Sequence, residues 1–315
     1  MKIAALSGGV GGARMAHGLA QCLPPSGLTV IVNTGDDLDH YGLHICPDLD
    51  TVCYTLAGLA SESTGWGRSG ETFQALGAAA ALGGPDWFNI GDRDLGTHLE
   101  RTRRLALGQT LSEITRHFCK QWGVGPAVLP MSDDRVATVV DTLELGELPF
   151  QEYFVHQQCQ PAVRAFRFEG AESARPAPGV IDALCEADAI ILTPSNPWVS
   201  VAPILAVPGV RDALQDKTVV AVSPIIAGKA VKGPAAKMYR ELGIQPGALA
   251  VAQHYKGLAS ALFIDNQDAA EAPAIAALGI QPVVTDILMP SIPERARLAG
   301  EVLAFLQNMK GGAST

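Results

Sequence analysis

Short apolar runs recur along the chain and end abruptly in small, polar, glycine or proline residues. They occupy residues 3–6, 30–32, 189–192, 219–222, 248–252 and 282–285. Runs without polar alternation are typical of strands buried on both faces of a parallel sheet. Amphipathic segments at 13–23, 112–122 and 294–307 predict helices between or after them. The pattern predicts an α/β fold with a doubly wound, mostly parallel Rossmann-like sheet, whose ligands bind at the carboxyl ends of the strands.

The middle of the chain has a different pattern. Residues 136–158 and 162–170 alternate apolar and polar side chains, as a half-exposed antiparallel pair does. We therefore expect a single α/β domain over residues 1–310, with a small inserted antiparallel and helical substructure at about 130–175. The last residues, 311–315 (GGAST), are expected to form a disordered tail.

Composition narrows the class of protein. The net charge of −9 argues against a nucleic-acid-binding surface, which needs a basic face. Six scattered cysteines without a CxxC pair suit a reducing compartment. No apolar stretch approaches the roughly 20 residues that span a bilayer, and the N-terminus lacks a signal-peptide pattern. We expect a cytoplasmic protein without a nucleic-acid or membrane partner, which self-associates as a homodimer.

A glycine cluster, SGGVGGAR, follows the first apolar run. Gly8, Gly9, Gly11 and Gly12 allow a tight turn and a close approach to phosphate at a helix N-terminus. The cluster departs from the dinucleotide fingerprint GxGxxG, because Arg14 occupies the third glycine position, and no Walker motif is present. A turn that serves only strand-to-helix packing is the alternative interpretation.

Five carboxylates follow the second apolar run. They are Asp36, Asp37, Asp39, Asp48 and Asp50. Two or three of them converging on one point would suit an octahedral Mg²⁺, and one could act as a general base towards an alcohol. Taken singly, each could equally be a turn or helix-capping residue.

Three further loops carry candidate binding residues. Residues 87–105 open with an aromatic pair beside charged residues, which could hold a flat heterocycle, or could simply be a capped amphipathic helix. The loops at 193–205 and 222–239 follow buried strands and could read a purine edge or neutralise a diphosphate. The candidates in these two loops are Ser195, Asn196, Ser200, Ser223 and Lys229.

The same segments together resemble the 2-phospho-L-lactate transferase family of coenzyme F-420 biosynthesis. The matching pieces run in family order up to about His254, and the resemblance is thinner beyond it. They are SGGVGGARMAHGL, VNTGDDLDHYGLHICPDLDTVCYTLAG, TGWGRSGETF, PDWFNIGDRDLGTHLERT, LPMSDDRVATVV, TPSNPWVSVAPILAVPGVRDAL and VSPIIAGKAVKGPAAKM.

The resemblance implies a reaction. A guanosine diphosphate ester of a three-carbon phosphoacid donates its phosphoester unit to the ribityl hydroxyl of the deazaflavin Fo, and GMP leaves. Lactyl, enolpyruvyl and glyceryl donors all remain open. An upstream guanylyltransferase would supply the labile donor.

The resemblance also implies roles for residues. The Gly8–Gly12 loop and the two later loops would hold the guanosine diphosphate. Mg²⁺ would be bound by Asp37, Asp48 and Asp50, with Asp50 and Asp37 as the catalytic carboxylates. The Fo site would be bordered by Asp50, Thr51, Trp87, Phe88, Arg93 and His98.

Two other functions compete with the transferase. A non-catalytic nucleotide-sugar-binding regulator of the same fold would keep the phosphate loop but would not bind Fo. An NAD-dependent oxidoreductase would need the third glycine, and its pyrophosphate would be repelled by the aspartate cluster.

Overall fold

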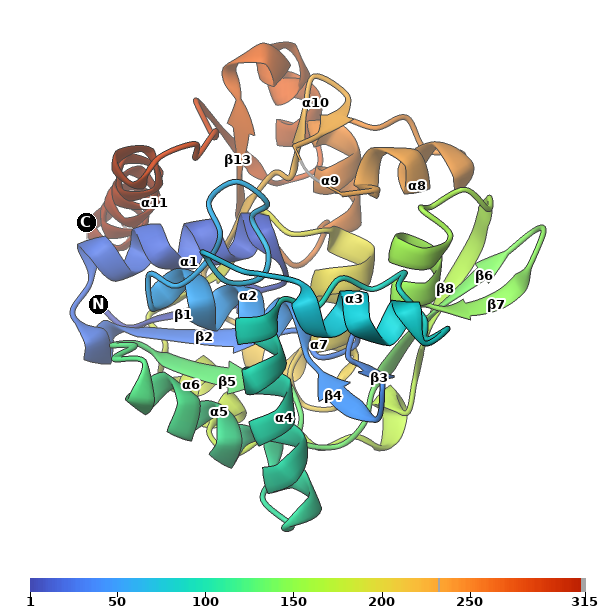
Figure 1. The fold of residues 1–315 in the computed structure, drawn as a ribbon. Coiled ribbons are helices and arrows are strands. Elements are labelled where there is room, and N and C mark those ends of the chain that lie inside the picture. The colour runs from blue at the N-terminus through green and yellow to red at the C-terminus, as the bar shows by residue number, and fades with distance from the viewer. Residues whose placement is uncertain (232, 313–315) are drawn as a thin grey trace.

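The computed structural model describes residues 1–231 and 233–312 of the chain (Figure 1). Its centre is a seven-stranded sheet in which every neighbouring pair is parallel. The strands are β1 (Ile3–Ser7), β2 (Leu28–Val32), β5 (Ala127–Pro130), β9 (Ala189–Leu192), β10 (Val219–Val222), β13 (Ala261–Asp265) and β14 (Gln281–Thr285).

The order of the strands places the site. It runs β14-β13-β10-β9-β1-β2-β5, so the chain winds outward from β1 in one direction and then from β9 in the other. The direction of winding therefore reverses between β1 and β9. In an open α/β sheet, ligands bind outside the carboxyl ends of the strands at such a switch point.

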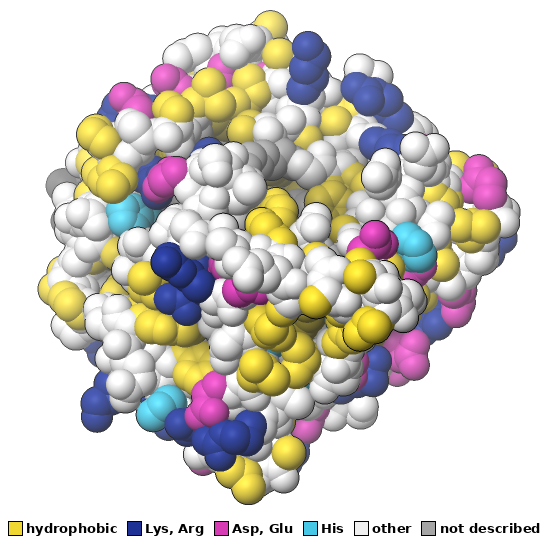
Figure 2. Space-filling view, viewed as in Figure 1, with side chains coloured by type: hydrophobic (Ala, Val, Ile, Leu, Met, Phe, Trp, Pro, Cys, Tyr) yellow, Lys and Arg dark blue, Asp and Glu magenta, His cyan; other side chains and the backbone are white. Residues whose placement is uncertain are grey.

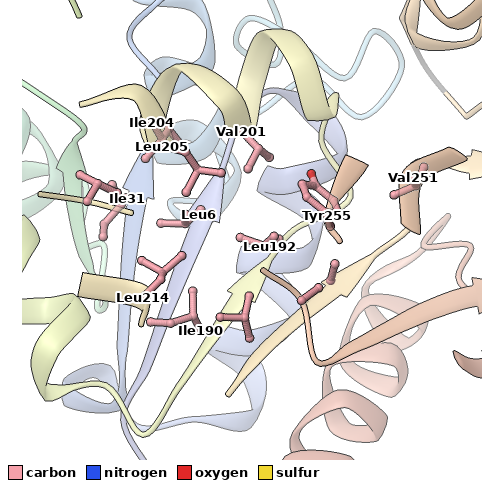
Figure 3. Close-up of a cluster of buried hydrophobic side chains, with 14 of the residues drawn as sticks. Leu6, Ile31, Ile190, Leu192, Val201, Ile204, Leu205, Leu214, Val251 and Tyr255 are labelled. Atoms are coloured by element: carbon pink, nitrogen blue, oxygen red, sulfur yellow. The ribbon is translucent and has the colours of Figure 1, made fainter. Parts of the chain in front are cut away.

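The chain forms helices on both faces of the sheet and around the cleft. They are α1 (Val10–Cys22), α2 (Pro47–Leu56), α3 (Gln74–Ala81), α4 (Asp92–Ala106), α5 (Leu111–Gln121), α6 (Val180–Glu186), α7 (Ala202–Ala206), α8 (Ala235–Glu241), α9 (Ala248–His254), α10 (Ala272–Ala276) and α11 (Ile292–Gly312). One apolar core joins the sheet to α1, α2, α5 and α11. A second core joins its other face to α6, α7, α9 and α10 (Figure 3). The predicted doubly wound fold is confirmed.

Successive residues of a central strand serve opposite cores. Ala4 and Leu6 of β1 pack in the second core, whereas Ile3 and Ala5 pack in the first. Both faces of the strand are therefore apolar, which explains the lack of alternation in the sequence.

Three small antiparallel sheets complete the fold. The largest contains β6 (Ala137–Thr142), β7 (Gly146–Pro149) and β8 (Val163–Glu169), so the predicted pair is part of a three-stranded sheet, which projects at one side of the molecule (Figure 1). The others are the hairpins β3 (Leu38–His40) with β4 (Leu43–Ile45), and β11 (Ile225–Ile226) with β12 (Lys229–Ala230).

Two details differ from the sequence predictions. Residues 248–252 form part of helix α9 and not a strand, because this alanine-rich run favours a helix and buries Ala248 and Val251 on one side of it. Helix α11 reaches Gly312, two residues into the expected tail; residues 313–315 lie outside the described residues. Within the described ranges, no helix is long and apolar enough to cross a membrane.

Candidate active site

A cleft of about 530 Å³ opens at the carboxyl ends of the strands, at the switch point. Its walls include the loops that follow β1, β2, β9 and β10. Figure 2 shows apolar side chains in the hollow near the centre of this face. The cleft brings together segments that are 280 positions apart in sequence, from Gly9 to Met289.

One wall is built from backbone at the start of α1. Gly9 is the N-cap residue; no side chain of the described residues caps this helix, and its first turn carries no acid. Val10 and Gly11 of this turn line the cleft, and the first N–H groups of a helix have no acceptor within the helix. Arg14, which departs from the dinucleotide fingerprint, also lines the cleft and adds a cation. This combination is suited to binding an anion.

The glycines of this turn are also required for packing. A Cβ on Gly11 would overlap the carbonyl oxygen of Pro194, and one on Gly8 would overlap the side chain of Ser200. A Cβ on Gly12 would likewise overlap the hydroxyl of Ser7. Gly8 and Gly12 do not line the cleft and serve packing, whereas Gly11 both packs on Pro194 and lines the cleft.

The loops after β9 and β10 supply the neighbouring wall. The predicted residues Ser195, Asn196, Ser200 and Ser223 all line the cleft, and the Ser195 hydroxyl accepts a hydrogen bond from the Gly8 N–H at 3.0 Å. The proton of the Ser223 hydroxyl is already engaged within the protein, because it is donated to the carbonyl oxygen of Ile225. Lys229 lies exposed on the β11–β12 hairpin and is not part of the cleft.

One member of the predicted metal set, Asp48, also lies on this side of the cleft. Asp48, together with Asp36, lies buried in the cleft wall. Asp48 accepts hydrogen bonds from Asn33 Nδ2 at 3.0 Å and from the Gly9 N–H. Burial raises the pKa of Asp48 to about 7. Burial and the charges of Asp48 and Asp37 raise the pKa of Asp36 well above its ordinary value.

The carboxylates of Asp36 and Asp48 are not fully neutralised by hydrogen bonds or cations of the described residues around them. Asp36 Oδ1 is buried and has no hydrogen-bond partner among the residues that the structure describes. Two carboxylates with raised pKa values and an unpaired oxygen fit a divalent cation with oxygen ligands. Asp36 was one of the five carboxylates but was not in the predicted metal set.

The other two members of the predicted metal set face different partners. Asp37 does not line the cleft and lies beside His44, with 3.5 Å between Asp37 Oδ2 and His44 Nε2. Asp50 lines the cleft, but Arg101 holds both of its oxygens: Nη1 donates to Oδ2 at 3.0 Å and Nη2 contacts Oδ1. Asp37, Asp48 and Asp50 therefore do not form one compact cluster.

Arg101 lies in a network that also includes His98. The guanidinium is 2% exposed and can only donate, so the His98 Nδ1, 3.3 Å from Nη1, accepts. The proton of His98 then lies on Nε2, which faces Asp94 Oδ2 at 3.4 Å. Asp94 also accepts a hydrogen bond from the Tyr54 hydroxyl at 2.6 Å. Burial raises the pKa of Asp94, but the interactions with His98 and Tyr54 outweigh it and lower the net value.

Another part of the cleft wall is aromatic. Phe88 lines the cleft beside Phe150 and Phe154 of the insert, whose rings stack with centroids 5.5 Å apart. Trp87 does not line the cleft and instead stacks on His156, 5.0 Å between centroids. Thr51, His98 and Asp94 complete this side of the cleft.

The insert also places an amide in this wall. Gln151 precedes the short π-helical turn Glu152–His156, is 6% exposed and lines the cleft next to Phe150. A buried side-chain amide offers a donor and an acceptor for the polar edge of a ring. Only its position directly after Phe150, in the segment PFQEYF, could have signalled it in the sequence.

A loop between α2 and α3 closes one end of the cleft. Thr64, Trp66 and Gly67 line it. Arg93, predicted to contact Fo, is exposed and donates to the carbonyl oxygen of Ser69 at 2.8 Å, so it anchors this loop and does not enter the cleft.

Sequence reasoning missed two other contributions. Arg101 could have been suspected, because it follows His98 by three residues and shares its helix face. Ile287, Leu288 and Met289 also line the cleft, although nothing in this part of the chain pointed to a role beyond the fold.

The fold and the cleft define a class of protein. It is an α/β protein with a glycine turn suited to an anion at its topological switch point and a carboxylate pair beside that turn. The model of the protein family described as "2-phospho-L-lactate transferase CofD" matches residues 3–293 of the chain. The chain belongs to this family of transferases. That membership argues against the oxidoreductase alternative.

Named relatives match this chain over nearly its whole length. A phosphoenolpyruvate transferase from Streptomyces griseus is 44% identical, covering 98% of this chain and 100% of the relative. The enzyme of the same name from Thermobifida fusca is also 44% identical, covering 98% and 99%. A third, from Mycobacterium sp. strain KMS, is 39% identical, covering 96% and 100%.

A crystal structure of a UPF0052 family protein from Bacillus halodurans has the same fold. It matches with a TM-score of 0.61 and 16% identity, covering 96% of this chain and 98% of the other. At this identity the likeness concerns the fold alone.

Proposed function

We propose that this protein transfers a phosphoenolpyruvate unit from a guanosine diphosphate donor to the ribityl hydroxyl of the deazaflavin Fo, releasing GMP, in the biosynthesis of coenzyme F-420. The observation that carries the proposal is one continuous cleft with an anion-binding turn on one wall, an aromatic surface on the other and paired carboxylates between them. The choice of the enolpyruvyl donor rests on the name of the relatives, which leaves the lactyl and glyceryl donors less favoured.

The donor fits the wall formed by α1 and the β9 loop. The free N–H groups of the α1 turn and the Arg14 guanidinium would bind its diphosphate. Ser195, Asn196 and Ser200 would contact the nucleoside.

Asp36 and Asp48 would hold Mg²⁺ here, in place of the predicted set of Asp37, Asp48 and Asp50. When bound, the ion would neutralise charge that develops on the phosphoryl oxygens. Asn33 keeps the Asp48 carboxylate oriented through the hydrogen bond to Oδ2.

The acceptor fits the aromatic wall. Phe88, Phe150 and Phe154 would border the flat ring system, with Gln151 at its polar edge. Asp50, held by Arg101 at the cleft surface, would orient the ribityl hydroxyl and take its proton as the oxygen attacks phosphorus. The bond from that phosphorus to the GMP oxygen breaks, so no covalent enzyme intermediate is needed.

The test is a turnover assay with purified protein, Mg²⁺, Fo and the three guanylylated donors in parallel, read by mass spectrometry. We expect product with all components present and the highest rate with the enolpyruvyl donor. A faster lactyl or glyceryl reaction would correct the donor. No product from folded protein that still binds guanine nucleotide, and that does not bind Fo, would favour the regulator alternative.

Asp50→Asn separates chemistry from binding in the same assay. We expect transfer to fall by about 100-fold or more, because a neutral amide cannot accept the proton, while guanine nucleotide binding stays within about twofold. Wild-type turnover by this variant would remove Asp50 from the reaction. A homodimer, an upstream guanylyltransferase and a cytoplasmic location stay predictions.

A further inference from the structure

A second group of ligand-type side chains lies behind the cleft wall, where the β3–β4 hairpin meets the start of α2. Ile45 and Pro47 line the cleft, whereas the neighbouring His44 and Cys46 do not. Alternation along an extended segment sends successive side chains to opposite sides. His44 and Cys46 thereby meet Asp37 on the far side of this segment.

These three side chains offer three different ligand atoms at one point. One nitrogen, one sulfur and one carboxylate oxygen lie within 4.8 Å of one another. The His44 Nε2 and Asp37 Oδ2 atoms are 3.5 Å apart, close to the separation of about 3.4–3.6 Å that tetrahedral bonds to nitrogen, oxygen and sulfur impose. The Cys46 sulfur also lies within 4.8 Å of these two atoms.

Neighbouring residues hold His44 in the way that protein metal sites hold their histidine ligands. His44 Nδ1 lies 3.0 Å from Asp39 Oδ1, which favours the proton on Nδ1 and leaves the Nε2 lone pair facing Asp37 and Cys46. Cys46 is fully buried and is the N-cap residue of α2; burial raises the pKa of its thiol, so the thiol keeps its proton until a metal ion displaces it.

A second observation indicates a missing partner. The Asp37 side chain is only 10% exposed, and its Oδ1 has no hydrogen-bond partner within the described ranges of the chain. A buried carboxylate oxygen without a partner is costly, and a cation removes that cost.

We propose that Asp37, His44 and Cys46 bind a borderline divalent transition-metal ion such as Zn²⁺, separate from the oxygen-ligand site of Asp36 and Asp48. A thiolate and an imidazole select such an ion over Mg²⁺. Binding releases the Cys46 thiol proton, and solvent supplies the fourth ligand, because the His44 side chain is 30% exposed. The ion ties the hairpin to α2 two residues before Asp48. The proposal does not depend on the proposed reaction.

Cobalt reports on the sulfur ligand directly. The background variant carries Cys22→Ser and Cys185→Ser, which remove the two exposed thiols, and excess Mg²⁺ occupies sites made only of oxygen. We expect Co²⁺ to give a thiolate-to-metal charge-transfer band that saturates at one ion per chain. Cys46→Ser should abolish the band, whereas Cys119→Ser, a matched change at another buried thiol, should leave it.

Two milder variants test the other ligands without relying on the buried cysteine. His44→Gln should weaken Co²⁺ binding at least 10-fold, and Asp39→Asn, which alters only the partner of His44, should weaken it about 10-fold. Zn²⁺ should raise the Tm of the wild-type protein but not of the His44→Gln variant. No charge-transfer band in the background variant, or a band that persists in Cys46→Ser, would overturn the proposal and leave an Asp37–His44 ion pair.

Discussion

The two walls of the cleft are built in different ways. The wall formed by α1 and the β9 loop presents backbone N–H groups. Its geometry depends on glycines at positions where any residue with a Cβ would overlap its neighbours. The wall formed by α2, α4 and the insert presents side chains, and its geometry depends on a buried ion pair and stacked rings. The first joins two short segments, residues 9–14 and 194–200, whereas the second is assembled from segments spread over about 100 residues.

The difference predicts how each wall fails. Damage to the backbone wall should remove nucleotide binding. Damage to the side-chain wall should appear in stability, in acceptor affinity or in turnover, with the nucleotide site intact. Four variants, ordered from the largest expected effect to the smallest, test this separation.

Arg101→Leu should have the largest effect, on stability. It leaves Asp50 buried without its partner, so we expect the free energy of unfolding to fall by about 3–5 kcal/mol. Denaturant unfolding measures it. Arg103→Leu is the matched control: Arg103 pairs with Glu100 on the exposed face of the same helix and should cost less than about 1 kcal/mol. If Asp50→Leu does not recover stability in the Arg101→Leu background, the unpaired charge is not the cause.

Gly11→Ala should remove nucleotide binding. The new Cβ would overlap the backbone carbonyl of Pro194, and the two loops that form the anion site would have to separate. We expect GDP affinity, measured by calorimetry, to fall about 100-fold. Gly77→Ala in the exposed helix α3 meets no atom within 4 Å; it should leave binding unchanged and stabilise by up to about 1 kcal/mol. Similar GDP affinity in both variants would contradict the role of this contact.

Asp48→Asn should change the pH dependence of stability without Mg²⁺. Burial raises the pKa of Asp48 from 3.8 to about 7, so the folded state binds this proton more tightly than the unfolded state does. Its contribution to stability is present below about pH 4, declines by up to about 1.4 kcal/mol per pH unit and levels off above pH 7. Asparagine cannot ionise, so Tm in EDTA should fall less steeply between pH 5 and 7.

Mg²⁺ provides the counterpart of that experiment. It should stabilise the wild-type protein more at pH 8 than at pH 6, because protons compete for the carboxylate, and it should stabilise Asp48→Asn much less. Asp86→Asn, at an exposed position, is the control and should follow the wild type. Identical Tm profiles for Asp48→Asn and wild type would remove Asp48 from the cation site.

Gln151→Leu should have the smallest effect, confined to the acceptor. Loss of the buried amide at the aromatic wall should weaken Fo binding, followed by fluorescence, about 10-fold, while GDP affinity stays unchanged. Gln160→Leu, an exposed position of the same insert, should change neither affinity. An equal loss of GDP affinity in Gln151→Leu would show that the two walls are not independent.

The carboxylates show why residues that are close in sequence do not all meet at one point. Asp48 and Asp50 are two residues apart in α2, so their side chains point about 200° apart around the helix axis. One meets Asn33 and Gly9, and the other meets Arg101. Proximity in sequence suggested one cluster, but the phase of the helix separated the residues.

The sequence by itself determined the parallel α/β fold, the glycine turn after β1 and the family. These follow from contiguous residues, because burial on both faces of a strand and a tight turn at a helix N-terminus leave local patterns. Only the tertiary structure decided that Arg101 holds Asp50, that Arg93 anchors a loop, and that Gln151 and residues 287–289 reach the cleft. Those contacts depend on helix phase, strand order and the placement of the insert, which join distant segments and leave no periodic pattern in the chain.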